Sequence, residues 1–169
     1  MVRRAAPVGG VKALAGVMLE KGLTLSVAES CTGGLIAKKI TDLPGSSGYF
    51  AGGVVAYSNR AKINILGIPP SVIGKYGAVS GRTASLMARR ARELFGTDLG
   101  CGVTGIAGPG GGTEAKPAGL IYYAVSKRGG TTVTKLLLKG SRASIRKKAS
   151  DMVLASLLAT AEKQGKRKK

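Results

Sequence analysis

The sequence predicts a single α/β domain of three layers (αβα), with a mixed, mostly parallel sheet and a hairpin in its C-terminal half. Helix and strand patterns alternate along the chain, which is typical of a sheet covered by helices on both faces. Two β-rich runs, 118–126 and 131–139, are joined across residues 127–130, whose sequence Lys-Arg-Gly-Gly favours a hairpin. The 169 residues, 44% of them hydrophobic, suffice for one core and are too few for two domains.

The N-terminal half predicts helices and strands in alternation. Apolar residues recur at helical spacing from Val11, and Lys21-Gly22 closes this first helix. The elements predicted next are a strand over 23–27, a helix over 35–43, a buried strand over 49–57, a short helix capped by Ser58, and another short helix over 71–76.

The C-terminal half predicts two longer helices and a central strand. A helix from Ser80 ends at Gly96, and residues 99–103 form a candidate central strand. The hairpin follows, and a last helix carries Ile145 to Leu158 on its inner face. We expect the domain to cover residues 1–162 and the basic residues 163–169 to form a disordered tail.

Charge is the strongest signal in the composition. Lys and Arg number 27 against 8 Asp and Glu, and the net charge of +19 favours a polyanionic partner such as nucleic acid. Part of this excess lies in the tail, and with 4% aromatic residues the chain has few side chains for stacking on bases. We therefore expect only non-specific, salt-sensitive contact with nucleic acid through the basic tail.

Several other kinds of site are disfavoured by the composition. The chain has no histidine and two distant cysteines, so neither a disulfide framework nor a Cys/His metal site is indicated, and we expect no cofactor. No apolar run is long enough to span a bilayer, and the N-terminus lacks the apolar core of a secretion signal. We expect a cytoplasmic protein that does not contact a membrane.

The segment Ser-Val-Ala-Glu-Ser-Cys-Thr-Gly-Gly, residues 26–34, carries the densest functional chemistry. Its pattern predicts a strand, a turn and the start of a helix, with Ser30, Cys31 and Thr32 at the helix start. Unpaired amides and the helix dipole at that position stabilise an anion or an oxyanion. Gly33 and Gly34 allow a ligand to approach the backbone closely. An ordinary helix cap explains the same pattern, so the segment needs support from elsewhere in the chain.

Two further strand ends are expected beside this turn, because ligands of such sheets bind beyond the carboxyl ends of the strands. The first holds Tyr57, Asn59 and Lys62. The second is the glycine-rich loop from Thr104 to Thr113, whose amides, with the charge of Lys116, would cradle a phosphate. A mobile surface loop is the alternative interpretation. The loop residues that we single out are Thr104, Gly105, Ala107, Gly108 and Thr113.

A serine nucleophile needs a base other than histidine in this chain. Lys62 is the candidate by position, because a desolvated lysine can be neutral enough to accept a proton, although a solvated surface lysine is the common alternative. Glu29 would orient Lys62, bind substrate or cap a helix. Cys31 is a rival nucleophile, since a helix start favours the thiolate, whereas Cys101 is expected to pack in the core.

Six motifs that occur in the same order and spacing make the chain closely resemble the CinA C-terminal domain family. Together they cover most of the chain from the first helix to the hairpin, which makes the resemblance specific. The motifs are Val27 to Gly34, Pro44 to Ser47, Tyr57 to Asn59 with Lys62, Gly77 to Ser80, Val103 to Pro109, and Lys116 to Gly119.

The resemblance implies a metal-independent nicotinamide-nucleotide amidase, which converts nicotinamide mononucleotide and water to nicotinic acid mononucleotide and ammonia. It implies Ser30 as the nucleophile, Lys62 as the base and a homo-oligomeric protein. We expect backbone amides around Thr32 to Gly34 to hold the oxyanion. The nucleotide site would then be lined by Tyr57, Asn59, Thr104, Gly105 and Thr113.

The chain also departs from the family pattern. Ser141 replaces the aspartate of a Gly-Asp-Arg motif, and Gly81-Arg82 stands where an acidic residue is more usual. The larger nucleotide-processing domain of many relatives is not expected here, nor is a coupled hydrolase activity. Two alternatives stay open: a catalytically silent nucleotide- or phosphate-binding domain, and a basic nucleic-acid-associated protein.

Overall fold

A five-stranded sheet forms the middle layer of the computed structural model, which describes residues 10–166. Parallel pairing joins the first three strands of the chain, and antiparallel pairing joins the last three. The predicted mixed sheet and hairpin are confirmed. In spatial order the strands are β2 (Phe50–Val55), β1 (Leu25–Glu29), β3 (Leu99–Gly105), β4 (Leu120–Lys127) and β5 (Gly130–Leu137).

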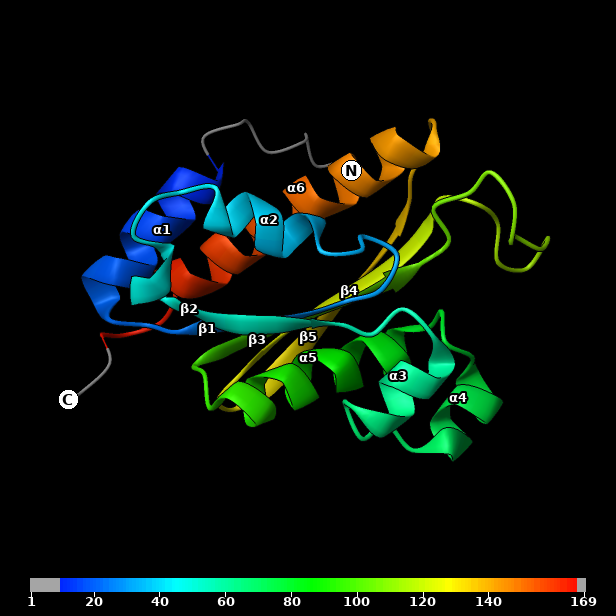
Figure 1. Cartoon of the computed structure of the whole chain (residues 1–169), viewed down its shortest axis with the longest axis horizontal. Coiled ribbons are helices and arrows are strands. Elements are labelled where there is room, and N and C mark those ends of the chain that lie inside the picture. The colour runs from blue at the N-terminus through cyan, green and yellow to red at the C-terminus, as the bar shows by residue number, and fades with distance from the viewer. Residues whose placement is uncertain (1–9, 167–169) are drawn as a thin grey trace.

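Helices cover both faces of the sheet, as Figure 1 shows, so the predicted three layers are confirmed. One face carries α1 (Gly10–Lys21), α2 (Leu35–Thr41) and α6 (Arg142–Glu162). The opposite face carries α3 (Asn59–Asn64), α4 (Pro70–Tyr76) and α5 (Gly81–Phe95). The largest hydrophobic cluster lies between the sheet and the first of these layers, and includes Leu14, Ile36, Val27 and Leu157.

Glycines in β3 bring α5 unusually close to the sheet. A Cβ atom on Gly100 would lie 2.3 Å from the carbonyl oxygen of Ala88, and one on Gly102 would lie 2.4 Å from the Ala88 nitrogen. Only glycine therefore fits at these alternate positions, while Cys101 and Val103, at the intervening and following positions, belong to the core on the opposite face. Cys101 is fully buried, as predicted.

The carboxyl ends of the parallel strands β1, β2 and β3 lie at the same end of the sheet, and the candidate site forms there. Glu29, the last residue of β1, pairs with Val55 of β2 and with Val103 of β3. The loop that follows β3 lies at the same end of the sheet as α3 and α4 (Figure 1). The register therefore gathers the three segments that the sequence singled out.

Strand β2 differs from its prediction. It is an edge strand with alternating exposure, and Val55 is 51% exposed, whereas the small apolar run predicted a buried strand. The small residues of β2 are instead explained by close packing against β1. A Cβ atom on Gly53 would lie 2.6 Å from the Val27 side chain.

The basic C-terminal segment also differs from its prediction at its start. Lys163 caps α6, and the Lys21 ammonium donates to the carbonyl oxygens of Ala161, Glu162 and Gln164 at 3.1, 2.6 and 2.8 Å. Cations at a helix C-terminus are stabilised by its unpaired carbonyls, so residues 163 and 164 are held in place. Residues 167–169 of the expected tail lie outside the described residues. Among residues 10–166, no helix has both the length and the hydropathy needed to cross a membrane.

Candidate active site

The centre of the candidate site is a buried contact between Lys62 and Ser30. Ser58 begins α3 by accepting a hydrogen bond from the Ala61 amide, and Lys62 follows one turn later with 1% of its surface exposed. Its Nζ donates to Ser30 Oγ at 2.9 Å and to the carbonyl oxygens of Ala56 and Tyr57 at 2.8 and 3.2 Å. The structure thus brings together the two residues predicted as nucleophile and base.

The environment of Lys62 favours its neutral form. Burial lowers the pKa of Lys62, because desolvation penalises the ammonium, and the nearby Cys31 opposes this shift only in part. Within residues 10–166, Lys62 forms no salt bridge with a carboxylate that would restore its charge. The carbonyl oxygens of Ala56 and Tyr57 take two of the three hydrogen-bonding positions of the Lys62 nitrogen. The third position therefore points to Ser30 Oγ.

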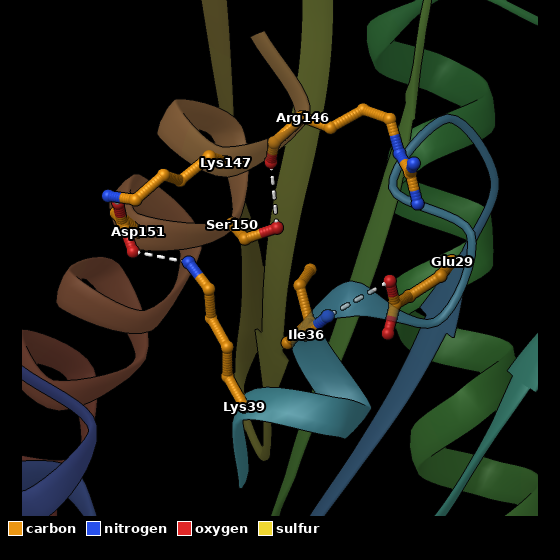
Figure 2. A network of polar contacts seen from close by, with 7 residues as sticks. All are labelled: Glu29, Ile36, Lys39, Arg146, Lys147, Ser150 and Asp151. Carbon is orange, nitrogen blue, oxygen red and sulfur yellow. Dashed lines mark hydrogen bonds and ion pairs between the residues drawn. The ribbon is translucent and has the colours of Figure 1, made fainter. Parts of the chain in front are cut away.

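Glu29 serves the backbone rather than the pocket. Its carboxylate accepts hydrogen bonds from the amides of Gly34, Ile36 and Ala37 at 3.0, 3.2 and 2.8 Å, of which Figure 2 shows the bond to Ile36. The side chain therefore caps α2, the structural role that the sequence left open beside substrate binding and orientation of Lys62. The amides of Gly34, Ile36 and Ala37 are consequently engaged and are not open to an anion.

Hydrogen bonds already formed within and beside the turn 30–34 limit which backbone amides could stabilise an oxyanion. The Gly34 amide is bound to Glu29, and the Gly33 amide donates to the Ser30 carbonyl at 3.0 Å, so neither of these two predicted donors is available. The amides of Cys31 and Thr32 donate to no backbone oxygen within residues 10–166. An oxyanion beside Ser30 would draw on these two amides.

Cys31 is a poorer nucleophile than the sequence suggested. The pKa of the Cys31 thiol is raised to about 12, mainly by burial and also by the charge of Glu29, which together outweigh the opposite effects of its own amide, Lys62 and the Thr32 amide. The prediction that a helix start would favour its thiolate is therefore wrong here. Ser30, next to it, is the hydroxyl that contacts the buried amine.

Residues from all three strand ends line a pocket of about 260 Å³ next to the Lys62–Ser30 contact. Nine of the predicted site residues are among them: Ser30, Cys31, Tyr57, Asn59, Lys62, Thr104, Gly105, Ala107 and Gly108. The others lie outside its lining: Glu29, Thr32, Gly33, Gly34, Thr113 and Lys116.

Two of these outer residues shape the glycine-rich loop. Lys116 was expected to supply charge to a phosphate, but its Nζ donates to the Tyr76 carbonyl at 3.1 Å and so ties the loop to α4. Thr113 Oγ1 accepts a hydrogen bond from the Lys116 amide at 3.1 Å within the loop. Both contacts fix the loop conformation instead of facing the pocket.

Arg142 is the main site residue that the sequence reasoning missed. From the first turn of α6 its guanidinium donates to the Gly108 carbonyl at 2.9 Å and to the Tyr57 hydroxyl at 2.8 Å, across the mouth of the pocket. The available signal was the Gly-Ser-Arg motif itself, which drew attention only for its missing carboxylate. The other missed lining residues, Ala78, Val79, Ile106, Gly110 and Gly111, carry no side chain with a chemical signature.

The departure at Ser141 has a simple structural explanation. Ser141 is the N-cap of α6, and its hydroxyl accepts a hydrogen bond from the Ser144 amide at 3.3 Å. Serine and aspartate are about equally good N-caps, so Ser141 fills the capping role that an aspartate would have at this position. Among residues 10–166 there is no group of three or more His, Cys, Asp or Glu side chains that would hold a metal ion.

Comparisons with known proteins place the chain among its relatives. Residues 11–161 match the family model of the CinA C-terminal domain. A CinA-like protein of Geobacter sulfurreducens is 52% identical over 134 residues, which are 79% of this chain and 32% of that protein. The chain therefore spans about a third of the length of the curated relatives it matches.

Solved structures show the same fold over nearly the whole of both chains. The competence/damage inducible protein CihA from Agrobacterium tumefaciens has a TM-score of 0.84 at 37% identity, covering 93% of this chain and 98% of that one. A competence or damage-inducible protein from Enterobacter asburiae has a TM-score of 0.87 at 34% identity, with 91% and 98% covered.

Proposed function

The chain belongs to the CinA C-terminal domain family, and on that premise we propose that it is a nicotinamide-nucleotide amidase. The reaction converts nicotinamide mononucleotide and water to nicotinic acid mononucleotide and ammonia. The observation that carries the proposal is the 2.9 Å contact between Lys62 Nζ and Ser30 Oγ, buried beside a pocket. A hydroxyl paired with a desolvated amine is an arrangement suited to nucleophilic attack on a carboxamide.

The geometry of Lys62 supports its role as the base. A neutral amine has two N–H bonds and one lone pair. The carbonyl oxygens of Ala56 and Tyr57 accept the two N–H bonds, which leaves the lone pair directed at the hydroxyl of Ser30. In this protonation state Ser30 donates the hydrogen bond to Lys62, and the proton can transfer along it.

The proposed reaction then proceeds through an acyl-enzyme. Lys62 accepts the proton of Ser30 as Oγ attacks the carboxamide carbon, and the amides of Cys31 and Thr32 stabilise the negative oxygen. The protonated Lys62 gives this proton to the amide nitrogen, the C–N bond breaks and ammonia leaves. Water, with Lys62 again accepting a proton, attacks the ester carbon, and Ser30 departs as the restored hydroxyl.

Arg142 and its neighbours supply a basic and polar rim for the rest of the nucleotide. The guanidinium of Arg142, the hydroxyl of Tyr57 and the side chain of Asn59 line the pocket together with the glycines of the loop after β3. A cation and close backbone amides suit a phosphate group. The pocket, at about 260 Å³, is at the small end of ligand pockets, which favours a mononucleotide over a larger ligand.

The test is ammonia release from the purified chain incubated with nicotinamide mononucleotide, with three variants measured in parallel. Ser30→Ala and Lys62→Ala should each abolish release, while Cys31→Ala should retain it. Retained activity in Ser30→Ala with loss in Cys31→Ala would contradict the assignment. A folded but inactive wild-type chain that binds the nucleotide would instead favour a silent nucleotide-binding domain; a thermal shift with the nucleotide measures that binding.

A further inference from the structure

The side chain of Arg146 contacts the turn that carries Ser30 from outside the pocket. Arg146 lies one helical turn after Arg142 on α6, and its Nη2 and Nε donate to the carbonyl oxygen of Thr32 at 2.7 and 3.2 Å. Figure 2 shows this side chain extending from α6 toward the turn that precedes α2. Its guanidinium is so close that a Cβ atom on Gly33 would lie 3.3 Å from Nη2.

The peptide between Thr32 and Gly33 is held at both of its polar atoms. Arg146 donates to the carbonyl oxygen of Thr32, and the amide of Gly33 donates to the Ser30 carbonyl at 3.0 Å. Thr32 contributes nothing further, since its hydroxyl is fully buried and has no hydrogen-bond partner among residues 10–166. The Leu35 amide also donates to the Thr32 carbonyl, at 3.3 Å, whereas Arg146 supplies the shorter contact at 2.7 Å and a second one at 3.2 Å. Arg146 is therefore the side chain that orients this peptide and the amides just before it.

Further contacts hold the part of α6 that carries Arg146. Asp151 of α6 forms an ion pair with Lys39 of α2, which joins the two helices one turn beyond Arg146 (Figure 2). The Ser150 hydroxyl donates to the Arg146 carbonyl at 2.8 Å within the same helix. The Glu29 carboxylate accepts hydrogen bonds from the amide of Gly34, the N-cap of α2, and from two amides of the helix itself. The turn and the helix start after it are thus held by two charged side chains, the Glu29 carboxylate and the Arg146 guanidinium.

We propose that Arg146 is a positioning residue, which holds the Thr32 carbonyl so that the amides of Cys31 and Thr32 face the oxyanion. This role rests on the amidase function proposed above. It also couples the nucleophile turn to α6, because Arg142, one turn earlier on this helix, reaches the opposite rim of the pocket. A bidentate guanidinium on one carbonyl is directional in a way that a lysine ammonium is not.

The kinetic test compares Arg146→Ala, Arg146→Lys and the matched control Lys147→Ala. Lys147 is the next residue on α6 and pairs with Asp151 at the surface, away from the turn. We expect kcat to fall about 10- to 100-fold in Arg146→Ala, with KM nearly unchanged, because small misplacements of catalytic donors act on the transition state. Arg146→Lys should recover only part of kcat, and Lys147→Ala should match the wild type.

Chemical rescue separates positioning from a general loss of structure. Guanidinium added at concentrations too low to unfold the protein should raise kcat in Arg146→Ala and leave the wild type and Lys147→Ala unchanged. A merely destabilised variant would lose further activity instead. Wild-type kcat in Arg146→Ala, or a change confined to KM, would overturn the proposal.

A second measurement does not depend on amidase activity. Cys31 belongs to the same turn, and release of the turn should expose its thiol, whose burial now raises its pKa to about 12. Each unit by which that pKa falls increases the thiolate fraction at pH 8 about tenfold, so Arg146→Ala should react with a thiol reagent at least about tenfold faster. Cys31→Ala in the same background identifies the reacting residue.

The two readouts distinguish the failure of this inference from the failure of the proposed function. If the wild type releases no ammonia, the amidase proposal fails, and the rate of Cys31 labelling alone decides whether Arg146 fixes the turn. Unchanged labelling in Arg146→Ala would show that the turn holds its shape without the guanidinium, and the inference would be refuted whatever the activity.

Discussion

Lys62 makes a specific contribution to the pH dependence of stability. Its pKa is lowered in the folded protein, so between that pKa and the unfolded value near 10.4 the unfolded chain binds more protons than the native one. The free energy of unfolding therefore rises with pH across this window because of Lys62, and the contribution is complete above the unfolded pKa. The gain is about 1.4 kcal/mol for each unit of pKa lowering.

The variant Lys62→Met isolates this contribution, because it keeps an apolar chain of similar length and removes the titrating group. Urea unfolding of both proteins at several pH values between 6 and about 10.4 gives the difference in free energy of unfolding, wild type minus variant. We expect that difference to increase with pH. The offset at any single pH matters less, since Lys62→Met also leaves the carbonyls of Ala56 and Tyr57 without their donor.

Cys31 is the group most able to confuse this measurement. Its thiol pKa is raised, so it contributes stability that is lost as pH rises above the unfolded value near 9, opposite in sign to Lys62. Measuring the difference in a Cys31→Ala background removes it, and the variant Lys147→Met, at an exposed lysine, is measured in parallel for comparison. A flat or falling difference for Lys62 would refute the inference that its ammonium is desolvated.

Three further predictions test other parts of the site. The rate kcat/KM for nicotinamide mononucleotide should rise with pH and level off above the lowered pKa of Lys62, as a pH–rate profile would show; a rate that falls over this range would contradict Lys62 as the base. Glu29→Gln should lose about 1–3 kcal/mol in urea unfolding, because the amide turns a donor toward backbone N–H groups; unchanged stability would contradict its capping role. Ser141→Asp should change the free energy of unfolding by less than about 0.5 kcal/mol and leave kcat unchanged, since both residues cap α6. A large gain of activity would instead assign the missing carboxylate a catalytic role.

The elements that the sequence predicted well are those whose signals are local. Ser80 and Gly96 bound α5 as an N-cap and a left-handed C-cap, and the turn within residues 127–130 closes the hairpin. The convergence of the three strand ends was also predictable, because it follows from the parallel pairing of β1 with its neighbours.

The misjudged features depend on partners distant in the chain. The periodicity of β2 cannot reveal that, among residues 10–166, no strand pairs with its outer edge, and the sequence of the 30–34 turn cannot reveal that Glu29 occupies the helix amides. Arg142 reaches Tyr57 across 85 positions of sequence, and Arg146 reaches Thr32 across 114. A basic residue near a helix start is common on any surface, so apart from the Gly-Ser-Arg motif at Arg142 nothing local separates these two arginines from the other cations of the chain.

For the proposed amidase, one physical environment favours serine over cysteine as the nucleophile in this turn. Burial disfavours every charged form, so it lowers the pKa of the Lys62 ammonium and raises that of the Cys31 thiol at the same time. A neutral amine and a neutral thiol cannot form the ion pair that activates a cysteine, whereas a neutral amine is what a serine hydroxyl needs as its base. In the proposed mechanism, the same burial that favours Lys62 as the base also keeps the Cys31 thiol protonated, which leaves Ser30 as the proposed nucleophile.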